Sequence, residues 1–370
     1  MSNAPVMAST YLEWAKLCSQ ATYNLATSGI MSYPLAELHV SPQDLEINGP
    51  TVYGYAPLQE RLAQKCGVTP DCVVAAAGTS MANHLAMAAL IEPGDDVLIE
   101  QPTYGPVLEV ALYLRANVIR FERRVEQDFQ IDPDDITRLI TPKTRLICLT
   151  NMHNPSGALT SNETLIRIGE IAQSSGAQVL VDEVYLDMVY DQPPRSSFHL
   201  GSNFVVTTSL TKAYGLSGIR CGWILAQPDL AIRMWRLSDL FDGSPVHPGE
   251  LLSVMALDQL GKIDARARTL LETNRKALDA FFSGRNDLDG FRSPWGTVCF
   301  PRLKNGSVDE FCEFLRAGYE TSVVPGRFFE MPDHFRIGIG GDPTMTGEAL
   351  KRLAAALDEW GTAGWKTNRS

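Results

Sequence analysis

The sequence predicts an α/β protein whose main sheet is largely parallel and covered by helices on both faces. Short apolar runs, rich in β-branched residues, alternate with longer segments of helical character. This rhythm is typical of successive strand–helix–strand units. Later in the chain, a long helical stretch is followed by short strand-like runs and two further helices. This change in the order of helical and strand-like segments predicts a second, smaller α+β unit.

Seven apolar runs are the candidate strands of the main sheet. In chain order they are Val73–Ala77, Asp96–Glu100, Val118–Phe121, Arg145–Thr150, Gln178–Val181, Phe204–Thr208 and Gly222–Ala226. Helices are expected between them, among others at Met81–Leu90, Gly105–Arg115 and Leu165–Ser174. Strands that are apolar throughout are typical of a sheet buried on both faces.

The smaller unit is predicted from the C-terminal third of the chain. A helical stretch runs from Leu251 to Phe282, and strand-like runs follow at Thr297–Pro301 and His334–Ile339. Helices are expected at Val308–Ala317 and Thr346–Trp360.

The chain has 370 residues, which is more than a single hydrophobic core usually supports. Two domains are therefore expected. Residues 46–245 would form the large domain and residues 246–370 the small one. Residues 1–45 are too short to fold alone, so we expect an N-terminal arm that contributes to the small domain.

Composition narrows the classes of partner. The formal net charge of −11 repels phosphate backbones and anionic lipid, so neither nucleic acid nor a membrane is an expected partner. The first ten residues lack the charged and apolar regions of a signal peptide. The seven cysteines are scattered and never form a Cys-x-x-Cys pair, a pattern typical of reduced thiols. These features favour a cytoplasmic protein.

Polar residues follow the predicted strands where ligands bind in open α/β sheets. Gly78 and Thr79 follow the first strand and open a helix, whose free N–H groups and positive dipole end suit a phosphate. The simpler interpretation is that Thr79 only caps the helix. Tyr104 follows the second strand, where it either faces a ligand or packs against the core.

Two further strand ends carry polar groups. Asn154 lies before a proline in a glycine-containing turn, where it either donates to a ligand or is ordinary turn punctuation. The neighbouring His153 has no partner at metal-ligand spacing, so we interpret it as structural. Asp182 and Tyr185 follow the strand that ends at Val181. A carboxylate there is costly unless a cation meets it.

The most informative segment is a glycine-rich loop between two predicted strands. It contains Ser209, Lys212 and Arg220. A lone lysine is usually a solvated surface group, but this one is bracketed by strands predicted to be buried. We therefore interpret Lys212 as a functional amine.

Together these residues predict a site for a pyridinium ring that carries an aldehyde and a phosphate, namely pyridoxal 5'-phosphate. The Lys212 amine would join the aldehyde as a Schiff base, and Asp182 would keep the ring nitrogen protonated. At about 4 Å and an effective dielectric near 20, that charge pair is worth roughly 4 kcal/mol. Tyr185 and Asn154 would bind the ring hydroxyl and Tyr104 would stack on the ring. The phosphate would be held by Gly78, Thr79, Ser209 and Arg220.

The motifs resemble those of the class I/II aminotransferases among the fold-type-I pyridoxal-phosphate-dependent enzymes. The matching landmarks, in order and spacing, are Asn154-Pro-Ser-Gly, Asp182-x-x-Tyr185, Ser209-x-x-Lys212 and Arg220. The resemblance extends from about Ser28-Gly29 to Arg336. It implies a large domain with a mostly parallel seven-stranded sheet and a smaller α+β domain. It also implies transfer of an amino group between an amino acid and a 2-oxo acid.

The resemblance further implies how the substrate is bound. Arg336, within a Phe-Arg-Ile run, would clamp the α-carboxylate, because its planar guanidinium meets a carboxylate in two places. Asn154 and Gly29 would also contact the substrate. Lys212, once freed, would remove the Cα proton as general base.

A homodimer with active sites at the subunit interface is also implied. In the family, a tyrosine from the early segment reaches the phosphate of the neighbouring subunit, and Tyr53 or Tyr55 could take this part. No arginine stands out as the reader of a second, distal carboxylate. Arg233 and Arg236 are candidates, but both fit equally well on a solvated helix face.

Other functions remain open at this point. A pyridoxal-phosphate lyase, decarboxylase or cyclase acting on an amino acid would share every cofactor residue. A non-catalytic module is disfavoured by the intact Lys212 and Asp182. A nicotinamide dehydrogenase is a poor fit, because Gly338-x-Gly340 lacks a third glycine. The chain also lacks the Gly-x-Ser-x-Gly elbow of hydrolases and any motif typical of zinc.

Overall fold

The computed structural model describes residues 8–362, and its centre is a seven-stranded sheet with the order β2-β8-β7-β6-β5-β3-β4. The strands are β2 (Val73–Ala77), β3 (Asp96–Gln101), β4 (Asn117–Glu122), β5 (Thr144–Thr150), β6 (Gln178–Asp182), β7 (Phe204–Ser209) and β8 (Cys221–Leu225). Strand β8 runs antiparallel to both of its neighbours, β2 and β7, and the other pairs in this sheet are parallel. Each strand lies within one residue of its predicted bounds.

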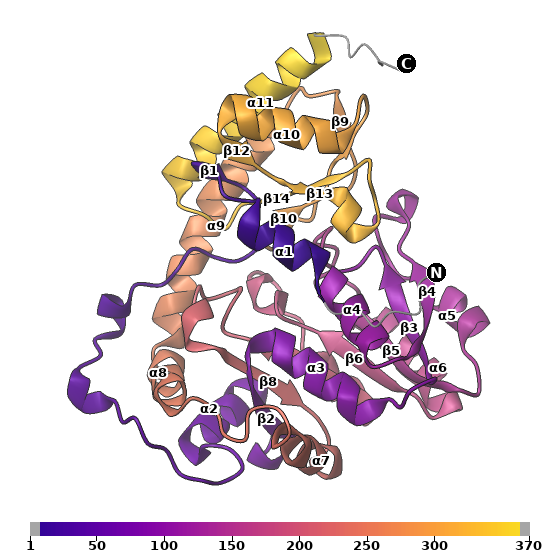
Figure 1. Ribbon diagram of the computed structural model, residues 1–370, viewed down its shortest axis with the longest axis vertical. Coiled ribbons are helices and arrows are strands. Elements are labelled where there is room, and N and C mark those ends of the chain that lie inside the picture. Colours follow the sequence, from indigo (N-terminus) through magenta and orange to yellow (C-terminus); the bar gives the residue numbers. More distant parts are fainter. Residues whose placement is uncertain (1–7, 363–370) are drawn as a thin grey trace.

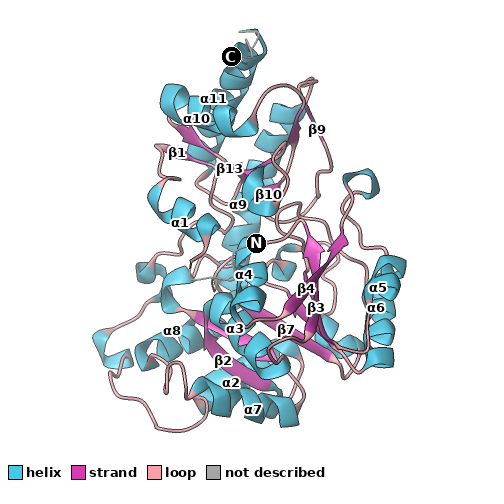
Figure 2. Cartoon of the chain, turned by 45° about the vertical axis from the view of Figure 1, so that its right-hand side comes forward, coloured by secondary structure: helices cyan, strands magenta, loops and turns pink. Residues whose placement is uncertain are grey.

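Helices cover this sheet, as Figures 1 and 2 show. Those associated with it are α2 (Ala56–Cys66), α3 (Gly78–Leu90), α4 (Gly105–Tyr113), α5 (Pro133–Leu139), α6 (Asn162–Ser175) and α7 (Pro228–Ser238). Helix α3 packs on β2, β6, β7 and β8, while α6 packs on β5 and β6. The residues of β7 and β8 are all buried, which explains why these strands are apolar with no alternation.

The smaller part lies above the main sheet in Figure 1, in orange and yellow. Its helices are α9 (Leu260–Phe282), α10 (Val308–Tyr319) and α11 (Pro343–Thr362), and its strands are β9 (Leu288–Asp289), β10 (Val298–Cys299), β11 (Arg302–Leu303), β12 (Thr321–Ser322), β13 (Val324–Pro325) and β14 (Phe335–Gly338). An early strand, β1 (Tyr23–Asn24), pairs with β12, so the N-terminal segment contributes to this part. The exact domain boundaries stay a prediction.

Two elements differ from the sequence-based expectation. The helical stretch predicted from Leu251 to Phe282 is two helices, α8 (His247–Asp258) and α9, which separate at Gln259. Helix α1 (Thr10–Leu17) was not predicted, because two turns give little periodic signal. Figure 1 shows α1 between the main sheet and the smaller part.

Two further features concern the residues that the structure describes. No helix within residues 8–362 is both long and apolar enough to cross a membrane. All seven cysteines are free.

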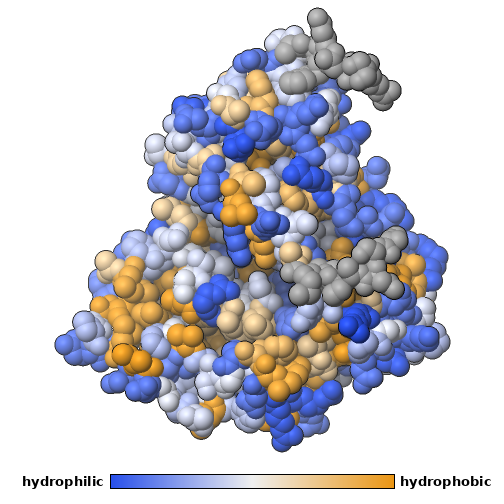
Figure 3. Space-filling view, in the orientation of Figure 1, coloured by the Kyte–Doolittle hydropathy of each residue, from blue (hydrophilic) through white to orange (hydrophobic). Residues whose placement is uncertain are grey.

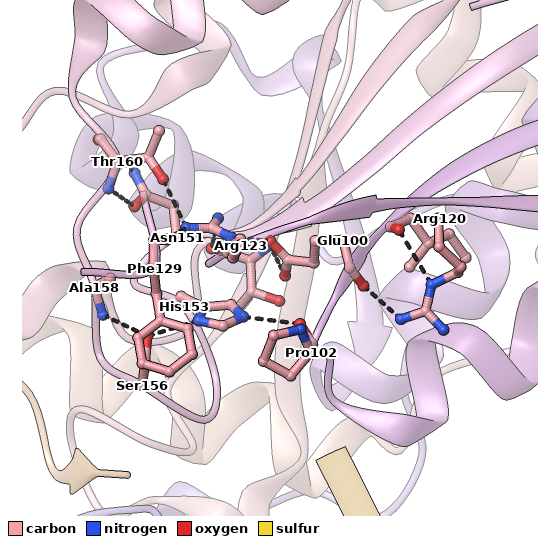
Figure 4. Close-up of polar contacts among 12 residues, drawn as sticks. Glu100, Pro102, Arg120, Arg123, Phe129, Asn151, His153, Ser156, Ala158 and Thr160 are labelled. Carbon is pink, nitrogen blue, oxygen red and sulfur yellow. Dashed lines mark hydrogen bonds and ion pairs between the residues drawn. The ribbon is translucent and has the colours of Figure 1, made fainter. Parts of the chain in front are cut away.

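A buried ion pair joins the ends of three neighbouring strands (Figure 4). Arg123 follows β4, and its Nε donates to Glu100 Oε2 of β3 at 2.7 Å. Arg123 Nη2 also donates to the carbonyl of Thr150, the last residue of β5, while Glu100 Oε1 accepts from the Thr150 N–H. Arg123 Nη1 binds Phe129 O and Thr160 Oγ1. Both charged side chains are almost fully buried, so each depends on the other.

Replacing Arg123 is expected to destabilise the protein strongly. Arg123→Met leaves the Glu100 carboxylate buried without its cation, which costs about 3–5 kcal/mol of unfolding free energy. Chemical denaturation of the variant measures the change. Arg167→Met is the control, because Arg167 pairs with Glu170 at the surface with 56% of its side chain exposed. Equal losses in the two variants would contradict the proposed importance of the buried pair.

Candidate active site

A cavity of about 320 Å³ lies at the carboxyl ends of the main-sheet strands, where α1 and the start of α3 also contribute walls. Most of the residues singled out from the sequence line it: Thr79, Tyr104, Asn154, Asp182, Tyr185, Lys212 and Arg220. Their convergence follows from the topology, because the carboxyl ends of parallel strands meet at one edge of a sheet. The remaining four adjoin lining residues: Gly29 and Gly78 are next to Ser28 and Thr79 in the chain, and Ser209 and Arg336 are hydrogen-bonded to Thr79 and Asn154.

One end of the cavity has the character of an anion site. It is formed where β2 turns into α3, so the first N–H groups of that helix are free of intrahelical partners. Thr79 Oγ1 donates to Ser209 Oγ at 2.8 Å, and Arg220 Nη2 donates to Ala77 O at 2.8 Å. Gly78 has a φ of +79°, and a Cβ there would collide with the Arg220 guanidinium. Glycine is therefore required both by the turn and by the arginine.

The opposite side of the cavity holds a buried carboxylate. Asp182 Oδ2 accepts from Asn83 Nδ2 at 2.8 Å and its Oδ1 accepts from the Val184 N–H at 3.1 Å. Asn83 is itself held by a short hydrogen bond from Thr207 Oγ1. Burial raises the pKa of Asp182 to about 6, and the hydrogen bonds from Asn83 and Val184 oppose this shift. A cation placed against Asp182 would favour its ionised form.

Lys212 faces the same cavity. Its Nζ donates to Ser28 Oγ at 3.1 Å, and Tyr185 OH donates to the same oxygen at 3.0 Å. Burial lowers the pKa of Lys212 to about 8, and the charge of Arg336 adds to this effect. A larger share of the amine is therefore neutral near physiological pH than for an ordinary lysine, and the neutral amine is the nucleophile.

Arg336 is fully buried behind Asn154 and Tyr11. Its Nη1 donates to Asn154 Oδ1 at 2.8 Å, and its Nη2 donates to Tyr11 OH at 2.9 Å and to Ala26 O at 3.0 Å. Its Nε has no hydrogen-bond partner among the described residues. The guanidinium thus lies one layer from the cavity, bound to two groups that line it.

Sequence reasoning missed three residues that complete this network: Tyr11, Ser28 and Asn83. Asn83 was detectable, because Thr79 and Asn83 are four residues apart on α3 and share one helix face. Ser28 precedes Gly29 but carries no motif of its own. Tyr11 meets Arg336 across 325 residues of sequence, which no local pattern encodes.

Four residues considered for the substrate or for a neighbouring subunit lie outside this cavity. The Tyr53 hydroxyl donates a hydrogen bond to Asp239 Oδ2 at 2.7 Å. The Tyr55 ring packs edge-on against the His247 imidazole, with 4.9 Å between the ring centroids. Arg233 and Arg236 are exposed on α7. The two arginines therefore do not bind a second, distal carboxylate of a substrate in the cavity of their own chain.

His153 connects two of the loops that form the site (Figure 4). Its Nε2 donates to Pro102 O at 3.0 Å, just before Tyr104, and its Nδ1 accepts from Ser156 Oγ at 2.7 Å, just after Asn154. Burial lowers the pKa of His153 well below its ordinary value, and the charge of Arg123 adds to this. A neutral imidazole is thus a positional link between the two loops.

Comparison with known proteins identifies the family. The sequence pattern of the aminotransferase class I and II family matches residues 37–353. The chain belongs to this family. It is 29% identical to capreomycidine synthase of Streptomyces vinaceus over 93% of this chain and 91% of that protein. It is 27% identical to the arginine–pyruvate transaminase of Pseudomonas aeruginosa, over 83% and 82% of the two chains.

Solved structures of PLP-dependent enzymes share the fold. A PLP-dependent aminotransferase from Streptococcus suis superposes with a TM-score of 0.91 and 26% identity, covering 96% of this chain and 99% of that one. A PLP-dependent cyclase superposes with a TM-score of 0.87 at 23% identity, covering 97% and 98%. The predicted fold class, a fold-type-I enzyme with a mostly parallel seven-stranded sheet, is confirmed. The predicted cofactor is confirmed too, because this is a family of pyridoxal-phosphate enzymes.

The residues of this class I and II family member fit that cofactor. The cavity has an anion site at one end and an amine and a buried carboxylate further in. Thr211 Oγ1, which belongs to a cavity-lining residue, is buried without a hydrogen-bond partner among residues 8–362. A bound phosphate or ring substituent supplies the partner that such a hydroxyl needs.

The lowered pKa of Lys212 predicts how the apoprotein takes up pyridoxal phosphate. Burial and Arg336 disfavour the charged amine, so the uptake rate should rise with pH through the Lys212 pKa of about 8 and level off where the amine is almost fully neutral. The growth of visible absorbance after mixing measures the rate across the neutral and alkaline range. A free lysine derivative, with a pKa near about 10.4, is the control. Uptake that follows the control's pH profile would contradict the assignment.

Proposed function

We propose that this protein is an aminotransferase that moves an amino group between an amino acid and a 2-oxo acid. The observation that carries the proposal is the shared cavity of Lys212 and Asp182, with the fully buried Arg336 directly behind it. When bound, pyridoxal phosphate supplies an aldehyde that joins amines and a ring that accepts electrons from the substrate Cα. The remaining tasks fall to side chains of this chain.

Gly78, Thr79, Ser209 and Arg220 would hold the phosphate. The Thr79–Ser209 hydrogen bond fixes two hydroxyls beside the N-terminus of α3, and Arg220 lies against the Gly78 backbone. Helix N–H groups, hydroxyls and a guanidinium are the donors that bind phosphate in proteins.

Asp182 would hold the proton on the ring nitrogen, and Tyr185 and Asn154 would donate to the ring hydroxyl. Asp182 suits this task because Asn83 and the Val184 N–H fix its two oxygens while burial leaves its charge poorly solvated. A cationic partner therefore gains more from this carboxylate than from a solvated one. Tyr104 would pack on the ring face.

Lys212 would hold the cofactor and, once displaced by the substrate amine, would move the Cα proton. Its contact with Ser28 Oγ keeps Nζ on the cavity side. A positioned base contributes roughly 10²–10⁴-fold to such a proton transfer. The pKa of Lys212, lowered to about 8, leaves a larger share of the amine unprotonated near neutral pH than in an ordinary lysine, and a general base must be unprotonated.

Arg336 and Asn154 would bind the α-carboxylate. The Arg336 bonds to Tyr11 OH and Ala26 O are the ones that a carboxylate can replace, because a carboxylate is a stronger acceptor than either. Gly29 would contact the substrate beside Lys212, since a Cβ at Gly29 would lie 3.2 Å from Lys212 Cδ. Any side chain at this position would crowd the lysine.

A second candidate is a cyclase that acts on the side chain of an amino acid. Capreomycidine synthase matches nearly the full chain, and the shared fold with a PLP-dependent cyclase supports the same alternative. Cyclisation and amino transfer share the cofactor residues, so the product distinguishes them.

The decisive experiment titrates the pyridoxal-phosphate-loaded protein with single amino acids. We expect one amino acid to remove the visible absorbance of the lysine-bound cofactor and to yield one equivalent of its 2-oxo acid. Lys212→Ala is the control and should lower turnover by at least about 10²-fold. A cyclic product without a 2-oxo acid would favour the cyclase, and normal turnover by Lys212→Ala would refute both.

A cytoplasmic homodimer is part of the proposal. Free cysteines fit a reducing compartment. Hydrophobic residues are exposed on two adjacent loops that Tyr53 and Asp239 connect, namely Ile47, Val52, Tyr53, Leu240, Phe241 and Val246. Figure 3 shows hydrophobic surface at the lower left, over the segment leading to α2. Through these loops Tyr53 or Tyr55 would reach the phosphate bound by the neighbouring subunit.

Sedimentation of the protein at micromolar concentration should give a dimer, and a stable monomer would count against the proposed homodimer.

A further inference from the structure

A second cavity adjoins the first between α1, α3 and α4, which lie together near the centre of Figure 1. Its volume is about 400 Å³. Leu12, Ser80, Asn83 and Tyr104 line both cavities. Asn83 binds Asp182, and Tyr104 lies at the proposed ring face. The second cavity therefore adjoins the place where the cofactor ring and the substrate Cα would lie, so a substrate side chain could extend into it.

The walls of the second cavity are mostly apolar, with one acidic side chain among them. Met81, Val107 and Val110 provide apolar surface, and Glu109 of α4 is the only acidic residue of the described lining. Glu109 Oε2 is buried and has no hydrogen-bond partner within residues 8–362. Glu109 is half-buried, but a buried carboxylate oxygen without a partner is costly, so it indicates a place for a cationic donor.

The Glu109 carboxylate lies near the turn that carries Tyr104. Its side chain reaches back along α4, so that a Cβ at Gly105 would lie 3.6 Å from Oε1. Of the described residues that line this cavity, none is a lysine or arginine. The lining does include His84, whose pKa burial lowers, so its imidazole is neutral at physiological pH. Glu109 is thus left without a cation from the described lining.

We propose that the second cavity receives the side chain of the amino-acid substrate, and that Glu109 binds a guanidinium or ammonium group at its end. This inference rests on the proposed function, because it takes Arg336 as the partner of the α-carboxylate. The apolar walls match the methylene stem of a long basic side chain, and the carboxylate matches its charged end. The substrate class is therefore amino acids with a cationic side chain.

The same geometry disfavours other amino acids. A side chain ending in a carboxylate would meet Glu109 with a like charge. A long uncharged side chain would enclose Glu109 and leave it without solvent or partner, so a buried polar group would lose its hydrogen bonds. Discrimination thus arises from Glu109 itself and requires no further residue.

The test compares ligands of equal shape and different charge. Arginine and citrulline have the same length, and only arginine is charged at its end. Calorimetry with cofactor-loaded Lys212→Ala, which cannot turn over, should show arginine binding on the order of ten- to hundred-fold tighter than citrulline. Glu109→Gln in that background should abolish the difference, because it weakens arginine without weakening citrulline. Turnover by the Lys212-containing enzyme, measured as kcat/KM, should follow the same order.

Two control variants separate this role from other effects. Glu126→Gln changes an exposed carboxylate elsewhere on the surface and should not alter the preference. Arg336→Lys should weaken arginine and citrulline alike, because both carry the same α-carboxylate. If Glu109→Gln weakens both ligands equally, or neither, the inference is overturned.

The inference and the proposed function fail in distinguishable ways. Arginine binding that depends on Glu109, without any 2-oxo acid from turnover, would retain the cation site and refute amino transfer. Transfer from uncharged amino acids, with no effect of Glu109→Gln on binding, would retain the aminotransferase and refute the cation site.

Discussion

The active site depends on the buried ion pair between Arg123 and Glu100, because this pair fixes where three strands end. Both charged groups bind the backbone of Thr150, the last residue of β5. The next residues form the loop that carries Asn154, whose side chain accepts from Arg336. The sheet therefore helps to position Arg336, the proposed partner of the α-carboxylate, through this one loop. Without the pair, an uncompensated charge would lie beneath that loop.

Charge within the cavity is opposite to that of the whole chain. The protein carries a formal net charge of −11, yet Lys212 and Arg220 line the cavity and Arg336 lies behind it, while Asp182 is the one acidic residue of the described lining. Arg336 and Arg220 both lower the pKa of Lys212, which shows that their fields reach its amine. A cavity with this balance attracts a phosphate and a carboxylate, the two anionic groups that cofactor and substrate bring.

The sequence predicted the sheet and most of the cavity because both are encoded locally. Apolar runs mark buried strands, and the polar residue after each run, such as Asp182, lies at the ligand-binding edge. Contacts that depend on distant segments were not predictable. Tyr11 reaches Arg336 only after the N-terminal helix has folded onto the site. Glu109 lies in a predicted helix, and no local pattern encodes the cavity that residues of α1 and α3 form with it.

What distinguishes one member of this family from another must lie outside the shared cofactor residues. Amino transfer and cyclisation both need the Lys212 amine and the Asp182 carboxylate, so neither residue selects the product. The product is selected by the position of the far end of the substrate side chain. That position decides whether a nucleophile on the side chain can approach the reacting carbons while Lys212 holds the Cα proton. If Glu109 binds a cationic end, it keeps that end across Tyr104 from Lys212. An extended side chain held in this way favours transfer, whereas ring closure requires the same chain to fold back.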